Sequence, residues 1–149
     1  MSFHYGIIHY KERKGDQIEM KEVQLHHTYE ETCTVTKDML ACNVGSGIVS
    51  VLATPMMIAK MEHAALECLA PFLEEGETSV GVMMNSTHDA ATPCGMNIVV
   101  SAKIVAIDRK KISFEIIARD DQDQIGKASH DRFVVNKERF EQKAQAKLD

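Results

Sequence analysis

Residues 54–73 read TPMMIAKMEHAALECLAPFL, and this stretch decides the fold. Thr54 suits the N-cap of a helix and Pro55 suits its first helical position, while Pro71 is expected to bend or end the last turn. A helical wheel leaves one narrow polar stripe, which consists of Lys60, His63 and Glu67. Because nearly every other position is apolar, we predict that this helix is covered on most sides and forms the centre of the domain. Its ionisable residues argue against a membrane span.

Strand patterns surround this helix. Partial alternation over residues 23–35 predicts a strand before it, and β-rich segments follow at residues 78–87, 96–107, 112–119 and 125–135. The polar turns at 108–111 and 120–124 are short, so consecutive strands must pair antiparallel. Asn136 is expected to cap a charged C-terminal helix. The pattern predicts an α+β fold, with one long apolar helix and about five antiparallel strands.

Length and composition limit the possible classes. The chain has 149 residues, with 44% hydrophobic and 26% charged residues, which is typical of one globular domain. We divide it into an N-terminal extension, 1–20, held loosely or as an edge strand, and a single domain, 21–149. The net charge of −5 disfavours nucleic acid as a partner.

The cysteines and the N-terminus indicate a compartment. Four cysteines occur at spacings that match no zinc ribbon or CxxC motif: Cys33, Cys42, Cys68 and Cys94. The first residues lack the apolar core of a signal peptide. We therefore predict reduced thiols and a cytoplasmic location, with no metal and no membrane partner.

Glu62 is the first candidate functional residue. It lies on the side of the helix opposite the polar stripe, where its neighbours are apolar. A lone carboxylate there is costly unless it is paired, and desolvation should raise its pKa towards the range of a general base. Two structural alternatives remain at this point: the helix end is partly open, or Glu62 faces a cation of a neighbouring subunit.

Two further positions carry candidate chemistry. His88 lies where a strand gives way to a loop, a place where polar residues often line sites, although an exposed loop histidine is the simpler interpretation. Alternation puts His130 and Arg132 on one face of the last strand and Asp131 on the other. The alternative for Arg132 is a solvated or salt-bridged strand residue. The sequence contains no GxSxG, P-loop, GxGxxG or HExxH motif.

Four segments in order resemble the hot-dog-fold acyl-coenzyme A thioesterases, specifically the fluoroacetyl-coenzyme A thioesterase-like group. They are LATPMMIAKMEHAA (52–65), APFLEEGETSVG (70–81), THDAATPCG (87–95) and DDQDQIGKASHDRFVV (120–135). The resemblance covers the domain apart from the first ~20 residues. It implies a long helix wrapped by a curved antiparallel sheet, an acyl-CoA substrate, and a homodimer or dimer of dimers with the site at the subunit interface.

The resemblance also implies roles for individual residues. Catalytic roles fall on Thr54, Glu62 and His88, and substrate-binding roles fall on Gly81, whose backbone approaches the thioester, and Arg132. No cofactor is implied, because the CoA moiety is part of the substrate. One departure concerns residues 37–52, KDMLACNVGSGIVSVL, which lack the phenylalanines that form a lid and gate in the fluoroacetyl-specific enzyme. A general small- or medium-acyl thioesterase is therefore expected.

The expected reaction is hydrolysis of the thioester. Glu62 would act as general base on water or as the nucleophile, His88 as its acid/base partner, and Thr54 as a positioning hydroxyl. Thr54 and Glu62 lie roughly 12 Å apart on a continuous helix, so either Thr54 folds back on a loop or the two act through the substrate or across an interface. The cations expected to receive the CoA phosphates are Arg132, Lys103, Arg109 and Lys127.

Two rival functions are compatible with the same residues. A hydratase or dehydratase of acyl thioesters also needs a carboxylate and a histidine in a thioester tunnel. A non-catalytic module would bind CoA esters without turnover, and Glu62 would then be replaceable.

Overall fold

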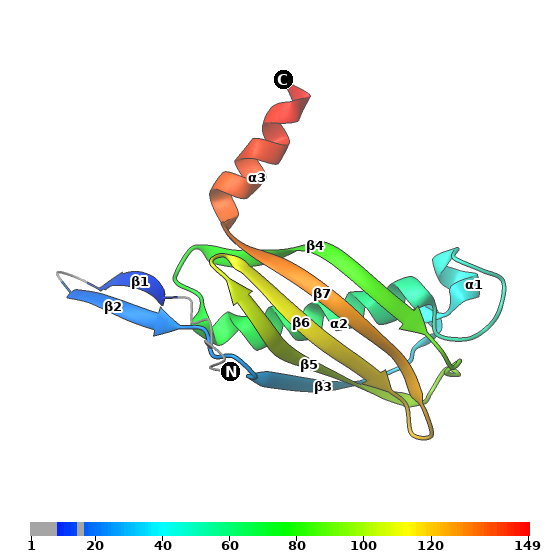
Figure 1. The fold of residues 1–149 in the computed structure, drawn as a ribbon. Coiled ribbons are helices and arrows are strands. Elements are labelled where there is room, and N and C mark those ends of the chain that lie inside the picture. The colour runs from blue at the N-terminus through cyan, green and yellow to red at the C-terminus, as the bar shows by residue number, and fades with distance from the viewer. Residues whose placement is uncertain (1–8, 15–16) are drawn as a thin grey trace.

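The computed structural model describes residues 9–14 and 17–149, with side chains from residue 22 onward. Strands β1 (His9–Lys14) and β2 (Gln17–Glu22) form a separate antiparallel two-stranded sheet beside the main body (Figure 1). The boundary predicted after residue 20 falls inside β2, and residues 1–8 and 15–16 of the predicted extension lie outside the described residues. The division into extension and domain stays a prediction.

The main sheet has five antiparallel strands in the order β3-β5-β6-β7-β4, which confirms the predicted α+β class. They are β3 (Thr28–Thr34), β4 (Glu77–His88), β5 (Asn97–Asp108), β6 (Lys111–Arg119) and β7 (Gln124–Asn136). The strand predicted over residues 23–35 is shorter than expected. His26 adopts a left-handed φ of 69° in a turn, and this turn interrupts extended pairing before Thr28.

The central helix α2 runs from Thr54 to Leu69, and the 3₁₀ turn η2 (Ala70–Phe72) contains Pro71 and ends it as predicted. The predicted N-cap was wrong by one residue. Ala53 is the N-cap, with φ −69° and ψ 139°, and Thr54 is the first helical residue. The Thr54 hydroxyl makes its hydrogen bond with His88 and caps no backbone N–H, which leaves the side chain available at the helix start.

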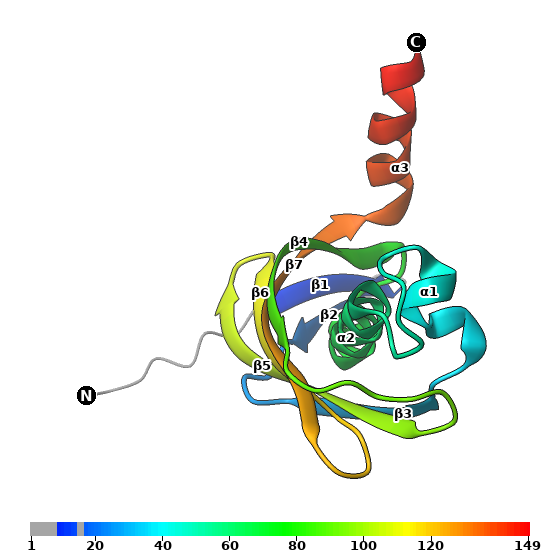
Figure 2. The ribbon, with the colours of Figure 1, turned by 90° about the vertical axis from the view of Figure 1, so that its right-hand side faces the viewer.

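The core lies between α2 and the concave face of the sheet, which curls around the helix in the end-on view of Figure 2. The inward residues of β6 alternate along the strand and are fully buried: Ile112, Phe114, Ile116 and Ala118. They pack with the buried face of α2, which consists of Met57, Met61, Ala64, Ala65, Cys68 and Leu69. Burial of these apolar surfaces provides most of the stabilisation of such a fold and holds α2 in one orientation.

Short elements complete the chain. The 3₁₀ turn η1 (Lys37–Met39) and helix α1 (Ala41–Val44) lie in the segment before α2, and Gly45 ends α1 with a φ of 89°. Helix α3 (Lys137–Gln145) and the turn η3 (Ala146–Leu148) stand away from the body (Figures 1 and 2). Asn136 caps α3 as predicted, because its side chain accepts a hydrogen bond from the Arg139 backbone N–H at 3.0 Å. None of the helices in the described ranges is long and apolar enough to cross a bilayer.

A glycine at the contact between β7 and α2 allows a first test. A Cβ at Gly126 would lie 2.5 Å from the Thr87 carbonyl oxygen and 2.8 Å from Met57 Sδ. We expect Gly126→Ala to lower the free energy of unfolding by about 1–3 kcal/mol in urea denaturation, because backbone and core must move apart. Gly47→Ala is the control, since its Cβ would make an ordinary 3.5 Å contact with Ala41, and an equal loss in both variants would contradict the expectation.

Candidate functional site

Thr54 and His88 meet where α2 begins and β4 ends. Thr54 Oγ1 lies 2.7 Å from His88 Nδ1, although the two residues are far apart in the sequence. The prediction that His88 lies where a strand gives way to a loop is confirmed, since it is the last residue of β4. The pair lines an open cavity of about 380 Å³, and the other lining residues include Ala41, Gly47, Val49, Ala53, Ala90 and Ala91. This size is within the range of small-molecule sites.

The environment of His88 favours a neutral imidazole. Burial lowers the pKa of His88 below its usual 6.5, and this effect outweighs the neighbouring Asp89 carboxylate, which raises it. His88 Nε2 is buried and has no hydrogen-bond partner among the described residues. Besides Thr54, the Ala90 backbone interacts with the ring and also raises its pKa, but burial has the larger effect. A neutral ring hydrogen-bonded to Thr54 is suited to accept and return a proton.

Glu62 occupies the middle of α2, and its partner comes from β7. Glu62 Oε2 lies 3.7 Å from Arg132 Nη1, with side-chain exposures of 45% and 7%. The carboxylate is therefore paired, and the cation that faces it belongs to the same chain and not to a neighbouring subunit, as one alternative had it. The carboxylate itself is partly exposed beside the buried guanidinium. The sequence carried a signal for this pairing, because alternation had already put Arg132 on one face of the last strand, but nothing local indicated that this face meets Glu62.

The Arg132 guanidinium is held by three further contacts. Its Nε donates to Ser79 Oγ at 2.8 Å, its Nη2 donates to the Ser79 carbonyl at 2.8 Å, and its Nη1 lies 3.2 Å from His130 Nε2. Gly81 provides the space beside this group, because a methyl group placed on it would lie 3.1 Å from Glu62 Oε2 and 3.1 Å from His130 Cε1. Gly81, Glu62 and Arg132 thus converge on one spot, as a shared site requires.

Within one chain, the five predicted site residues form two clusters. Thr54 and His88 lie at the start of α2, whereas Glu62, Gly81 and Arg132 lie roughly two helical turns further on. Among the residues that the structure describes, no hydrogen bond or ion pair joins Glu62 to Thr54 or His88. Because Thr54 is a helical residue, a loop folding back is excluded. Joint action must therefore run through a bound molecule or a second subunit.

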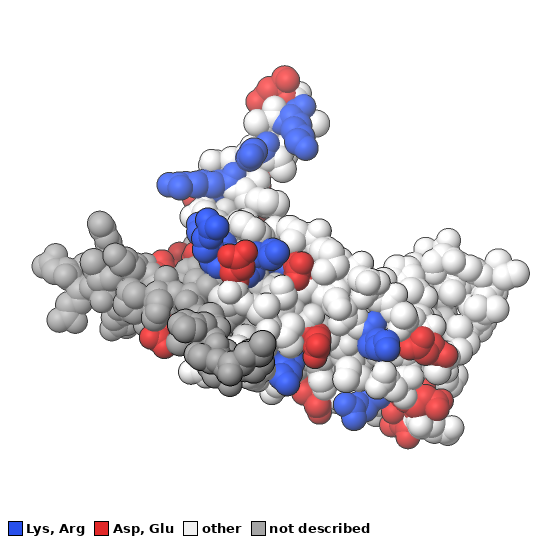
Figure 3. Space-filling model, viewed as in Figure 1, with Lys and Arg blue, Asp and Glu red and all other residues white. Residues whose placement is uncertain are grey.

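The cations predicted for the CoA phosphates differ in access. Arg132 is buried and its guanidinium is bonded to Ser79, so it cannot reach a phosphate in solvent. Lys103, Arg109 and Lys127 are exposed. Figure 3 shows scattered Lys and Arg side chains over the sheet and along α3. In the same view, no charged side chain is visible over α1, at the upper right.

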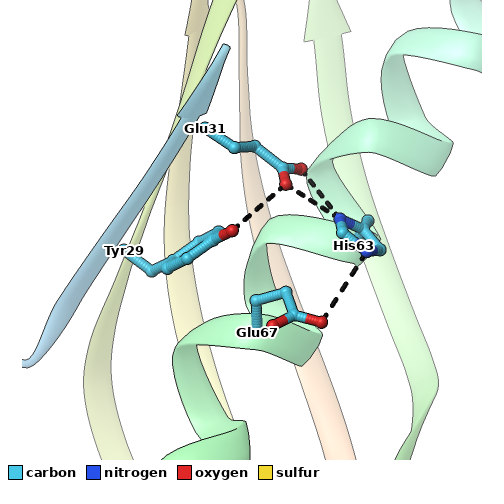
Figure 4. A network of polar contacts seen from close by, with 4 residues as sticks. All are labelled: Tyr29, Glu31, His63 and Glu67. Atoms are coloured by element: carbon cyan, nitrogen blue, oxygen red, sulfur yellow. Dashed lines mark hydrogen bonds and ion pairs between the residues drawn. The ribbon is translucent and has the colours of Figure 1, made fainter. Parts of the chain in front are cut away.

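The polar stripe of α2 faces away from both clusters. His63 Nδ1 lies 2.9 Å from Glu31 Oε2 on β3, its Nε2 lies 3.8 Å from Glu67, and the Tyr29 hydroxyl donates to Glu31 at 3.5 Å (Figure 4). The network ties the helix to the edge strand β3. With the His63 side chain 52% exposed, its contribution to stability is on the order of 0–1 kcal/mol, and the prediction of a solvated stripe agrees with its position.

Comparison with known proteins identifies the family. The profile of the family described as fluoroacetyl-CoA-specific thioesterase matches residues 35–138. The chain belongs to this family. It is similar to the fluoroacetyl-CoA thioesterase of Streptantibioticus cattleyicolor, with 38% identity over 97 residues, or 65% of this chain and 70% of that protein. As its family membership indicates, the chain is a thioester hydrolase, and the predicted resemblance is confirmed.

Solved structures agree with this assignment. A mutant of the fluoroacetyl-CoA thioesterase in complex with acetyl-CoA superposes with a TM-score of 0.82 at 28% identity, covering 85% of this chain and 100% of that one. A thioesterase superfamily member from Thermus thermophilus superposes with a TM-score of 0.77 at 25% identity, covering 83% and 92%. The hot-dog fold of the thioesterase is therefore confirmed.

Two histidines, the buried His130 and the half-buried His88, predict how the stability of the thioesterase depends on pH. Burial lowers the pKa of His88 and of His130 below the usual 6.5. Below pH 6.5, the unfolded chain therefore binds protons more readily than the folded chain, so the free energy of unfolding should fall as the pH drops. The loss is at most about 1.4 kcal/mol per pH unit for each histidine. Urea denaturation near pH 7.5 and 5.5 measures this loss. The double variant His88→Gln/His130→Gln should show a smaller loss, and an unchanged one would contradict the assignment.

Proposed function

We propose that this thioesterase hydrolyses CoA esters of small or medium acyl groups, with Thr54, Glu62 and His88 as its catalytic residues. Gly81 and Arg132 are proposed to lie beside the bound thioester. The observation that supports this most is the 2.7 Å contact between Thr54 and His88 on the wall of the cavity. The acetyl-CoA complex of a similar protein supports the substrate class.

The walls of the cavity support a broad acyl range. Its lining is rich in small side chains, and the segment before α2 contains no phenylalanine that could close over the acyl group. Val49, which lines the cavity and is 57% exposed, forms an apolar lip instead. Such a lip accepts aliphatic groups through dispersion and burial but makes no fluorine-specific contact, so we propose that fluoroacetyl selectivity is weak here.

The proposed chemistry follows from the charges of the two clusters. Glu62 takes a proton from water as the water oxygen attacks the thioester carbonyl. Alternatively, its carboxylate attacks directly, which expels the CoA thiolate and leaves a mixed anhydride that water then hydrolyses to the free acid. The carbonyl oxygen gains negative charge, which a backbone N–H near Gly81 stabilises. When the carbon–sulfur bond breaks, CoA leaves as a thiolate with a conjugate-acid pKa of roughly 8.5. The thiolate recovers the proton that Glu62 took from water, with the neutral His88 accepting that proton and passing it to the sulfur, so both side chains return to their starting states. The reaction needs no cofactor, since CoA is part of the substrate.

A homodimer would bring the two clusters together. β4 is an edge strand of 12 residues, and in the described part of the chain no strand pairs with its outer side. Val82 is 56% exposed there, which is unusual for a free edge. Antiparallel pairing of two β4 edges would put the His88 end of one strand beside the Glu77 end of the other. Each His88 would then approach the Glu62 cluster of the second subunit.

The proposed location is the cytoplasm. All four cysteines are free, and two of them, Cys42 and Cys94, are exposed. Exposed free thiols are typical of a reducing compartment, which is also where acyl-CoA esters are handled.

Replacement of the acid tests the chemistry. We expect Glu62→Gln to lower kcat for thiol release from a short acyl-CoA by about 100-fold or more, because the amide neither accepts the proton of water nor attacks. His63→Gln, one position further on the exposed side of α2, is the matched control and should stay near wild type. Turnover of Glu62→Gln near wild type would remove Glu62 from the chemistry. Ultraviolet detection of enoyl-CoA hydration without thiol release would indicate a hydratase, and tight binding without turnover a binding module.

The proposed interface has its own test. We expect Val82→Lys to dissociate the dimer in sedimentation velocity, because it puts two like charges beside the two-fold axis, whereas Ile117→Lys on the outer face of β6 should not. Co-expression of the inactive variants Glu62→Gln and His88→Ala should restore about a quarter of wild-type activity, since mixed dimers contain one intact shared site. No restoration in a mixture that forms mixed dimers would show that each site lies within one subunit.

A further inference from the structure

A buried histidine lies behind the Glu62 cluster. His130 is near the middle of β7, its side chain points to the concave face, and it is 1% exposed. Its ring lies beside Phe114 of β6, with ring centroids 6.2 Å apart. The proposed reaction assigns it no step, and a buried polar ring needs hydrogen bonds to be tolerated in a core.

The contacts of His130 permit only one state of its ring. Nδ1 lies 2.8 Å from the Met83 carbonyl oxygen, which can only accept, so Nδ1 carries a hydrogen. Nε2 lies 3.2 Å from Arg132 Nη1, which can only donate, so Nε2 must offer its lone pair. Both contacts are therefore satisfied only by the neutral ring with its proton on Nδ1.

The Met83 carbonyl owes its place to an irregularity in β4. The pairing of β4 with β7 shifts register between Gly81 and Met83, as in a β-bulge. Bulges redirect backbone groups at functional sites. Here the residue after the shift supplies the acceptor for His130, and the glycine before it leaves room for the Glu62 carboxylate.

We propose that His130 is a positioning residue: as a neutral acceptor it orients the Arg132 guanidinium, which in turn holds the Glu62 carboxylate beside Gly81. Ser79 fixes Nε and Nη2 of the guanidinium, so its remaining group, Nη1, is the one that faces both His130 and Glu62. The inference rests on the proposed role of Glu62.

The charges around His130 agree with this role. Burial lowers its pKa and Arg132 lowers it further, whereas the Met83 hydrogen bond and the carboxylates of Glu62 and Asp131 raise it. The strands beside β7 add no titratable side chain in contact with the ring. Protonation would place a second positive charge 3.2 Å from Nη1 and remove the acceptor, so the contact that keeps Nη1 beside Glu62 would be lost although the two hydrogen bonds to Ser79 remain.

A double-mutant cycle on thiol release tests the proposal. We expect His130→Phe to lower kcat by about 10-fold or more with KM within about 3-fold, because a ring of similar size cannot accept from Arg132. His130→Gln should retain most of kcat, since its Oε1 replaces the Nε2 lone pair. In a Glu62→Gln background, His130→Phe should change kcat by less than about 2-fold, because its effect passes through Glu62. An equal fall in both backgrounds, or no rescue by Gln, would show a merely structural role and overturn the proposal.

Nitrogen-15 NMR of the wild-type imidazole separates this proposal from the proposed function. We expect a protonated Nδ1 and an unprotonated Nε2 for His130 from about pH 6.5 to 8. A ring protonated on Nε2 or on both nitrogens in this range would overturn the inference without any measurement of activity. If Glu62→Gln instead keeps wild-type turnover while the NMR result holds, the proposed catalytic role of Glu62 fails and the orientation of Arg132 by His130 stands.

Discussion

The ion pair between Glu62 and Arg132 is the interaction on which the site depends. An apolar helix enclosed by a sheet can present a carboxylate only if a cation and hydrogen bonds offset its desolvation. Arg132 supplies that charge from β7, and Ser79 and His130 together accept three hydrogen bonds from its guanidinium. The Glu62 carboxylate is half exposed, whereas Arg132 is buried. The carboxylate therefore faces outward from a cation that is held in place. This arrangement suits a group that must meet water and substrate repeatedly without moving.

The fold places the two clusters of proposed site residues at different positions along α2. The end of α2 that carries Thr54 meets the end of β4 that carries His88, and there the protein has a cavity with an apolar lip. The middle of α2 meets β7 and carries Glu62, the proposed catalytic carboxylate. Roughly 20 Å of extended strand lies between Gly81 and His88, so a rigid single subunit keeps the two clusters apart. A second copy joined along the exposed edge of β4 offers the simplest way to unite them.

Much of this architecture could be predicted from the sequence, because its strongest patterns are local. The apolar helix, the alternation in β6, the two short turns and the Asn136 cap each depend on residues close in sequence, and each was found where predicted. The errors have local causes as well. The Thr54 hydroxyl makes its hydrogen bond with His88 and not with a backbone N–H of its own helix. His26, with a positive φ, turns the chain before β3 begins. The partner of Glu62 could not be predicted, because pairing across a core depends on the register of β7 against α2, which no local pattern encodes.

Gly81 has a consequence for where the Glu62 carboxylate can lie. The only space available for a side chain at this position is the space that the Glu62 oxygen and the His130 ring already border, 3.1 Å away on each side. A larger side chain at this position would compete with the Glu62 carboxylate for the same space. Alanine here would require the Glu62 carboxylate or the His130 ring to shift by a few tenths of an ångström, and a larger residue would require more, so this one strand residue limits how closely the carboxylate can lie against β4.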